Sequence, residues 1–309
     1  MSASTLAPVA LFVYNRPEHT RQTIEALASN PEAALTRLYV FSDAAKSDDA
    51  VPAVAAIRSY LRTIEGFGHV EVVERDVNFG LARSIIDGVT RLCQDYGRVI
   101  VLEDDLVTSP YFLRYMNDAL DLYADEERVM HVSGSAYPIG PFSWHADTYF
   151  LRVPLCWGWG TWGRAWDKFE KDPAVMQKFD TAMIKSFNFD DTYNYWQQLE
   201  LNQAGKINTW FVFWYAQIFV RKGLALFPAV SLVRNIGHDG TGVHCGETTV
   251  YDMELSTKRL SVLKIPLEES TKAFVAHKKY FRKISPSLAR RIFTRTRRLL
   301  SGLRASING

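Results

Sequence analysis

The stretch RVIVLEDDLVTSPYF, residues 98–112, runs from four apolar residues straight into three acids, Glu103, Asp104 and Asp105. The apolar run 99–102 is typical of a strand that is buried on both faces of a parallel sheet. Three neighbouring carboxylates repel one another, and a strand end offers little water to solvate them. The stretch is therefore either a site that a cationic ligand completes or a solvated acidic turn before the next helix.

The first 135 residues alternate between strand and helix patterns. Expected strands cover residues 9–13, 38–41, 69–74 and 99–102, and expected helices cover 17–28, 49–64, 81–96 and 109–124. Strands separated by helices of this length predict right-handed βαβ units and a mostly parallel sheet. The predicted fold class is therefore α/β, with helices flanking the sheet.

Polar residues also follow the other expected strands. Tyr14, Asn15 and Arg16 come after the first strand, Asp43 comes after the second, and Asn78 lies between the third strand and its helix. Open parallel sheets bind their ligands at the carboxyl ends of the strands, where these loops converge. This convergence favours a binding site over a solvated turn.

Three carboxylates at such a site suit a divalent cation. Hard oxygen ligands prefer Mg²⁺ or Mn²⁺, and a bound cation removes the repulsion between neighbouring acids. The same cation can stabilise the negative charge of a leaving diphosphate. The sequence thus predicts Mn²⁺ or Mg²⁺ as the cofactor of a site that binds phosphate oxygens.

These motifs resemble those of a known family. The segment VIVLEDDLVTSPYFLRYM is similar to the metal-binding strand of nucleotide-sugar-dependent glycosyltransferases with the GT-A fold, in particular the N-acetylglucosaminyltransferase I family. The segments FVYNRPEHT, FSDAAK and NFGLARS precede it in the order found in GT-A enzymes. Further along, CWGWGTWGRAW and LVRNIGHDGTGVH resemble bacterial relatives from polysaccharide gene clusters. The resemblance covers residues 8–135 well and 145–250 loosely, and it implies a GT-A-like, Rossmann-type sheet.

The resemblance assigns roles to the acids and to two strand-end residues. Asp105 would bind the metal directly, while Asp104 would face the ribose or donor sugar and Glu103 the sugar. Arg16 matches an arginine that contacts the base or a phosphate. Asp43 matches an aspartate that accepts a hydrogen bond from the uracil N–H, which implies a UDP-sugar donor.

The rest of the expected nucleotide-sugar site lies nearby in the sequence. Asn78 and Arg83, in NFGLARS, would lie near the ribose and the diphosphate, as the resemblance implies. Ser84 stands where the family has a histidine, so one nucleotide contact of the family is missing here. Tyr14 and Asn15, at the end of the first strand, complete the candidate site.

The catalytic base is not settled by the resemblance. The family uses an aspartate beside a tryptophan, but the matching stretch TWFVFW, residues 209–214, contains no acid. An inverting transferase needs a carboxylate that deprotonates the attacking hydroxyl. We expect Asp239, in the loop NIGHDGTG, to be this base, with Asp191 as the second candidate.

Composition places the chain among ordinary globular proteins with a basic C-terminal end. All eight tryptophans fall between residues 142 and 215, where they could form an acceptor platform or pack in the core. The three cysteines fit neither a disulfide framework nor a zinc motif, which favours a reducing cytosol. We expect no signal peptide and no transmembrane helix, because no apolar run is long enough.

The C-terminal end carries a strong charge asymmetry. After Glu269 there are eleven Lys or Arg residues and no acid, so the first 269 residues have 25 basic and 34 acidic side chains. On a helical projection, residues 285–305 separate an apolar face from an arginine-rich face. Such a helix can lie on an anionic membrane surface or dock on the protein itself. The membrane is favoured because arginines border the apolar face, and this placement would suit a lipid-linked acceptor.

Together these patterns predict a GT-A-like domain over residues 1–269 and a basic amphipathic tail over 270–309. Within the domain, residues 1–135 would bind the nucleotide sugar and residues 136–269 the acceptor. The expected protein is a cytoplasmic enzyme, either free in the cytoplasm or peripheral on the inner face of the membrane. It would transfer a sugar from a UDP-sugar to a glycan or lipid-linked glycan. The alternatives are a sugar nucleotidyltransferase and a catalytically inert protein that binds glycans or membranes; binding to nucleic acid is not expected.

Overall fold

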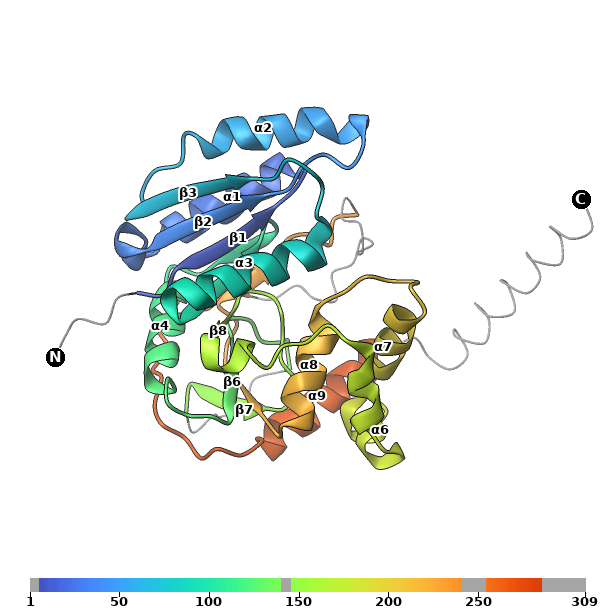
Figure 1. The fold of residues 1–309 in the computed structure, drawn as a ribbon. Helices are drawn as coiled ribbons and strands as arrows, with labels where there is room; N and C mark the ends of the chain where they lie inside the picture. The colour runs from blue at the N-terminus through green and yellow to red at the C-terminus, as the bar shows by residue number, and fades with distance from the viewer. Residues whose placement is uncertain (1–5, 140–145, 241–253, 285–309) are drawn as a thin grey trace, which may run out of the picture.

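The computed structural model describes residues 6–139, 146–240 and 254–284, in which a central sheet is covered by helices on both faces (Figure 1). The described residues form an eight-stranded sheet in the order β3-β2-β1-β4-β8-β6-β9-β7. In that order its strands are His69–Glu74, Arg37–Ser42, Val9–Val13, Arg98–Glu103, Trp159–Trp162, Val129–Ser133, Leu224–Pro228 and Thr148–Leu151. Only β8 and β7 run against the direction of the other strands of this sheet. The predicted α/β fold with a mostly parallel sheet is confirmed.

Burial on both faces explains why the central strands read as continuous apolar runs. In β1, Val9, Leu11 and Val13 join a core cluster with α1 (Pro17–Ala28), α2 (Val51–Leu61) and α4 (Phe112–Leu122). Ala10 and Phe12 face the other way and join α3 (Gly80–Tyr96), α5 (Gly163–Trp166) and α8 (Phe211–Val220). Successive side chains of a strand point to opposite faces, so both faces must be apolar.

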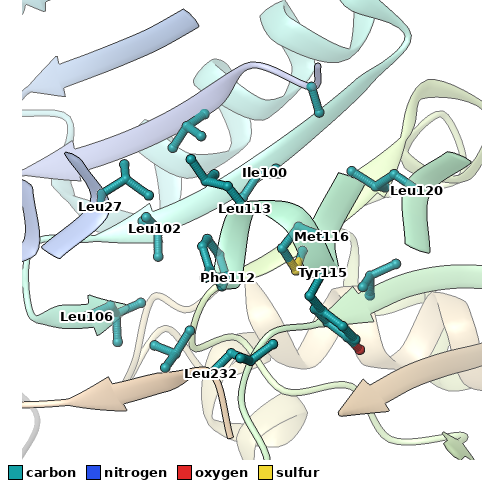
Figure 2. Packing of buried hydrophobic residues seen from close by; sticks show 14 of the residues in the cluster. Leu27, Ile100, Leu102, Leu106, Phe112, Leu113, Tyr115, Met116, Leu120 and Leu232 are labelled. Carbon is teal, nitrogen blue, oxygen red and sulfur yellow. The ribbon is translucent and has the colours of Figure 1, made fainter. Parts of the chain in front are cut away.

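The first of these clusters anchors the acidic strand end. Figure 2 shows Phe112 and Leu113 of α4 beside Ile100 and Leu102 of β4, and all four side chains are fully buried. Burying large apolar side chains contributes roughly 1.5–3 kcal/mol each. Packing against α4 therefore fixes the position of β4, the strand that carries the acids.

Expected and observed elements agree closely over the first half of the chain, apart from two of the expected helices. The helix expected from residue 109 begins at Phe112, because Leu106–Thr108 forms a short strand, β5. β5 pairs antiparallel with β10 (Val233–Asn235), so a segment from far along the chain runs beside the acidic turn. The other predicted helix that differs, over 49–64, begins with a 3₁₀ turn, η2 (Asp48–Ala50), before α2.

The glycine- and tryptophan-rich stretch forms the core strand β8, which lies between β4 and β6. Trp159 is 0% exposed, and Trp162 and Trp166 are each 4% exposed. A Cβ on Gly160 would lie 2.9 Å from the Met116 Cε and 3.1 Å from the Val99 oxygen, so glycine permits this close approach. These three tryptophans therefore pack in the core and are not available as a platform for an acceptor.

Of the remaining described elements, one lies in the first half of the chain and four lie in the second half. They are η1 (Pro31–Leu35), η3 (Pro173–Lys178), α6 (Thr181–Phe187), α7 (Tyr195–Gln203) and α9 (Thr271–Ile284). Within the span predicted as a tail, α9 buries Ala273, Ala276 and Phe281 against the rest of the protein.

The predicted amphipathic helix over residues 285–305 lies outside the described residues, so its contact with a membrane stays a prediction. The domain boundary at residue 269 likewise stays a prediction. Over the described ranges, no helix has the length and apolar character needed to span a membrane.

Candidate active site

The register of the parallel strands brings three polar loops level with one another. Phe12 of β1 pairs with Phe41 of β2 and with Glu103 of β4. Two positions beyond these paired residues lie Tyr14, Asp43 and Asp105. The structure thus places the ends of β1, β2 and β4 at one edge of the sheet, which is where α/β proteins bind their ligands.

The acidic turn is fixed by hydrogen bonds to its backbone and side chains. The Thr23 hydroxyl of α1 donates to the Asp104 backbone oxygen at 2.9 Å, and the Tyr14 N–H donates to Asp104 Oδ2 at 3.3 Å. Burial, and to a lesser extent the neighbouring Asp105 carboxylate, raise the pKa of Asp104 to about 7. Burial, Asp105 and Asp104 also raise the pKa of Glu103 well above its usual range. These raised pKa values reflect the crowding of three carboxyl groups at a buried strand end.

Arg16 lies between two carboxylates, Asp105 and Asp239, that are far apart in the sequence. Its guanidinium contacts Asp105 Oδ2 at 2.8 Å and Asp239 Oδ1 at 3.4 Å. His19, in the first turn of α1, contacts the other oxygen of Asp239 at 3.1 Å. The Arg16 and Asp105 side chains are 14% and 19% exposed, whereas Asp239 is 42% exposed. The cluster therefore combines two shielded partners with one carboxylate that solvent reaches.

The segment that carries Asp239 is held against the acidic turn. Pairing of β10 with β5 brings it alongside, and the Ile236 N–H donates to the Asp105 backbone oxygen at 2.9 Å. The Asn235 side chain accepts from the Gly237 N–H at 2.7 Å, which tightens the following turn. A Cβ on Gly237 would lie only 2.0 Å from Asp105 Oδ2. Glycine is therefore required at residue 237 for this approach.

Asp43 stabilises the loop that leads into α3. Its Oδ1 accepts from the Ala44 and Phe79 N–H groups at 2.9 and 2.8 Å, and its Oδ2 accepts from the Gly80 N–H and Asn78 Nδ2 at 2.8 and 3.1 Å. Four donors match the roughly four acceptor sites of a carboxylate. Asp43 and Asn78 thus shape this part of the candidate site, and contact of Asp43 with a uracil stays a prediction.

The other expected nucleotide-sugar residues lie around the same edge. Tyr14 accepts a hydrogen bond from the Lys46 N–H at 3.1 Å, and the half-buried Asn15 lies between Tyr14 and Arg16. Arg83 is exposed on α3, with its guanidinium 3.7 Å from the centroid of the Phe79 ring. This stacking fixes the direction of the Arg83 side chain.

Asp191 lies in a different part of the protein. It is exposed in the turn between α6 and α7, and its neighbour Asp190 pairs with Lys278 of α9 at 2.8 Å. Figure 1 shows these helices grouped at the end of the molecule opposite α2. Of the two expected bases, Asp239 is the one that the structure joins to Arg16 and so to Asp105.

Sequence reasoning missed His19 and Gly237. His19 follows Arg16 by three residues, so a helix starting at Pro17 would place the two side chains close together, and this signal was available. Gly237 gave no signal, because its importance depends on a carboxylate more than a hundred residues away in the sequence.

The site fits a cation that binds together with a phosphorylated ligand. Over the described ranges, no group of three or more His, Cys, Asp and Glu side chains could hold a metal ion. Asp105 offers a carboxylate at the strand end, next to the cationic Arg16. Mg²⁺ commonly takes one or two carboxylates and completes its shell with water and substrate phosphates. Asp105 therefore suits such shared coordination, whereas the described residues do not form a cage for the metal.

Comparisons with known proteins give no close relative. No family model and no curated protein matches the sequence. Among solved structures, mouse xyloside xylosyltransferase 1 in its apo form is similar at 9% identity and a TM-score of 0.38, over 70% of this chain and 82% of that one. The mannosyltransferase PcManGT from Pyrobaculum calidifontis, in complex with GDP-Man and Mn²⁺, is similar at 10% identity and a TM-score of 0.35, over 70% of each chain.

TarS from S. aureus is also similar, at 12% identity and a TM-score of 0.30. That likeness covers 46% of this chain and only 24% of TarS, so this chain spans about a quarter of that protein. At TM-scores below 0.5, such likenesses assign neither a fold family nor an activity.

Proposed function

We propose that this protein is a metal-dependent glycosyltransferase that moves a sugar from a nucleotide diphosphate sugar to a hydroxyl of a glycan or lipid-linked glycan. The resemblance over residues 8–135 supports a UDP-linked donor and a hexosyl or N-acetylhexosaminyl group. The resemblance of CWGWGTWGRAW and LVRNIGHDGTGVH to bacterial relatives from polysaccharide gene clusters supports a role in surface polysaccharide synthesis. The observation that carries the proposal is the position of Arg16 between Asp105 and Asp239 at the strand ends. A cationic side chain between two carboxylates suits transfer from a diphosphate to a hydroxyl.

The donor would lie along the ends of β1 and β4. Asp105 would hold Mn²⁺ or Mg²⁺, which when bound neutralises charge on the leaving diphosphate. Arg16 already contacts the same carboxylate and is placed to bind phosphate oxygens through its planar guanidinium. Glu103 and Asp104, next in the turn, would face the donor sugar and ribose.

We propose that Asp239 is the base that deprotonates the acceptor hydroxyl. Its exposed carboxylate can meet an incoming hydroxyl, while Arg16 and His19 each hold one of its oxygens. A carboxylate that removes the hydroxyl proton during attack on the face opposite the diphosphate leads to inversion of the anomeric centre. Asp191 ranks second, because it lies in the exposed turn between α6 and α7, where its neighbour Asp190 pairs with Lys278 of α9 and not with the Arg16–Asp105 pair.

The proposal is tested by UDP release from a panel of UDP-sugars in the presence of Mn²⁺. Asp105→Asn keeps the size of the side chain but removes its charge, and we expect the rate to fall roughly a hundredfold. Asp125→Asn makes the same chemical change at an exposed position after α4 and should leave the rate unchanged. Paramagnetic resonance of Mn²⁺ mixed with UDP gives an independent readout, because Asp105→Asn should also weaken formation of the ternary complex.

Two results would redirect the proposal. Nucleotide binding without turnover of any donor in the panel would indicate a catalytically inert binding protein. Formation of a UDP-sugar from UTP and a sugar 1-phosphate would indicate a nucleotidyltransferase instead.

A further inference from the structure

A groove of about 570 Å³ runs along the outer face of α3. Six of its lining residues lie on α3, at positions i, i+3, i+4, i+7, i+8 and i+11 counted from Arg83, so they share one helical face. These are Arg83, Ile86, Asp87, Thr90, Arg91 and Gln94. Lys171 and Asn208, from loops in the second half of the chain, also line the groove. The groove therefore lies between the half expected to bind the donor and the half expected to bind the acceptor.

The charged side chains that line the groove differ in whether they form ion pairs. Arg91 pairs with Glu71 at 2.7 Å, and Asp87, which also lines the groove, pairs with Arg75. Within the described part of the chain, Arg83 and Lys171 take part in no ion pair. These two cations therefore remain to attract an anionic ligand.

The polar side chains of the groove are held in place. Arg83 stacks on Phe79, and the Lys171 ammonium donates to the Asn208 side-chain oxygen. The Thr90 hydroxyl accepts from Trp166 Nε1 at 2.9 Å, and this indole belongs to the buried aromatic core. Side chains fixed in this way lose little freedom when they bind a ligand.

We propose that this groove binds the acceptor as a saccharide chain that carries anionic groups, an inference that rests on the proposed transferase function. The hydroxyl and amide groups of Thr90, Gln94 and Asn208 suit sugar hydroxyls, and Lys171 suits a carboxylate or phosphate. Arg83, which is expected to lie near the donor diphosphate, is at the end of the groove that meets the donor site. One end of the groove, at Arg83, lies about one helical turn from Gly80, whose N–H is held by Asp43 at the candidate donor site. The groove thus extends from the nucleotide loop along α3.

The test measures binding of defined saccharides to the full chain by titration calorimetry. Tetragalacturonate supplies carboxylates, glucose 6-phosphate supplies a phosphate, and maltotetraose is the neutral comparison. We expect the anionic ligands to bind and Lys171→Glu to weaken them about tenfold, since the variant removes an attraction and adds a repulsion. Asn208→Asp, which adds charge without changing size, should act in the same direction.

Lys168→Glu is the matched control, because it reverses an exposed charge three residues away that does not line the groove. Carboxylate or phosphate binding that only the groove variants weaken supports the inference and identifies the anionic group. Equal binding of maltotetraose, equal weakening by Lys168→Glu, or no binding of either anionic ligand would overturn it.

Donor hydrolysis without acceptor separates this inference from the proposed function. Lys171→Glu should leave UDP release unchanged, because the residue is distinct from the Arg16–Asp105–Asp239 cluster. Turnover of UDP-sugar without saccharide binding would refute the groove alone. Saccharide binding without any turnover would refute the transferase.

Discussion

Substitution of Gly237 by alanine tests the contact that joins the two halves of the candidate active site. The added methyl group would lie 2.0 Å from Asp105 Oδ2 and 2.9 Å from Arg16 Nη1. Ordinary contact begins near 3.4 Å, so the carboxylate oxygen must move by about 1.4 Å. The side chain can turn away, but its 2.8 Å pair with Arg16 would then break. A hydrogen bond to a charged group contributes about 1.5–3 kcal/mol, which bounds the expected loss of unfolding free energy.

The effect on catalysis should exceed the effect on stability. A catalytic group displaced by about 1 Å can lose roughly a hundredfold in rate, and Asp105 moves by more than that in Gly237→Ala. UDP release with Mn²⁺ and urea unfolding would be measured on the same preparation. Gly163→Ala is the control, since its added methyl group meets the Cys93 backbone oxygen at 3.2 Å and the Gly97 backbone oxygen at 3.6 Å, away from the site. A Gly237→Ala protein with the rate and stability of the wild type would refute the proposed packing of this segment on Asp105.

Three further predictions concern other parts of the fold and site. Asp43→Ala removes the acceptor for four donors and should lower the unfolding free energy by about 2–4 kcal/mol in urea titrations; an unchanged midpoint would contradict its capping role. Asp239→Asn should reduce glycosyl transfer at least about a hundredfold while Asp191→Asn leaves it intact, and the reverse pattern in product assays would move the base to Asp191. Burial lowers the pKa of His131 to about 3 and of His277 to about 4, from 6.5, so both stay neutral in the folded protein while the unfolded chain takes up protons. The stabilisation that this gives is fully present above about pH 6.5. As the pH falls toward 4, the unfolding free energy decreases by up to about 1.4 kcal/mol per pH unit for each histidine. His277→Phe should make this decrease smaller in denaturation experiments at several pH values.

Local patterns were enough to predict the framework of the sheet. β1 covers Val9–Val13 and β3 covers His69–Glu74, with the same bounds as the expected strands. These strands could be predicted because each is a short apolar run, and a continuous apolar run indicates a strand that is buried on both faces. The place of the acids at the end of β4 was predicted in the same way, from the apolar residues just before them.

The composition of the tryptophan-rich stretch was not enough to decide its role. Glycines beside tryptophans are compatible with a platform or with close packing, and the difference depends on what lies opposite. The structure places Met116 and the Val99 backbone against Gly160, which settles the packing of β8. No pattern within residues 155–170 contains that information.

By itself, the sequence determined the α/β alternation, the position of the acids after a buried strand, and the polar residues at the neighbouring strand ends. Only the tertiary structure decided which distant residues complete the site. The pairing of β10 with β5 brings Gly237 and Asp239 to Asp105 and Arg16, across 223 positions between Arg16 and Asp239. Contacts of this kind depend on how whole strands pair and pack, and no periodicity within a short segment encodes them.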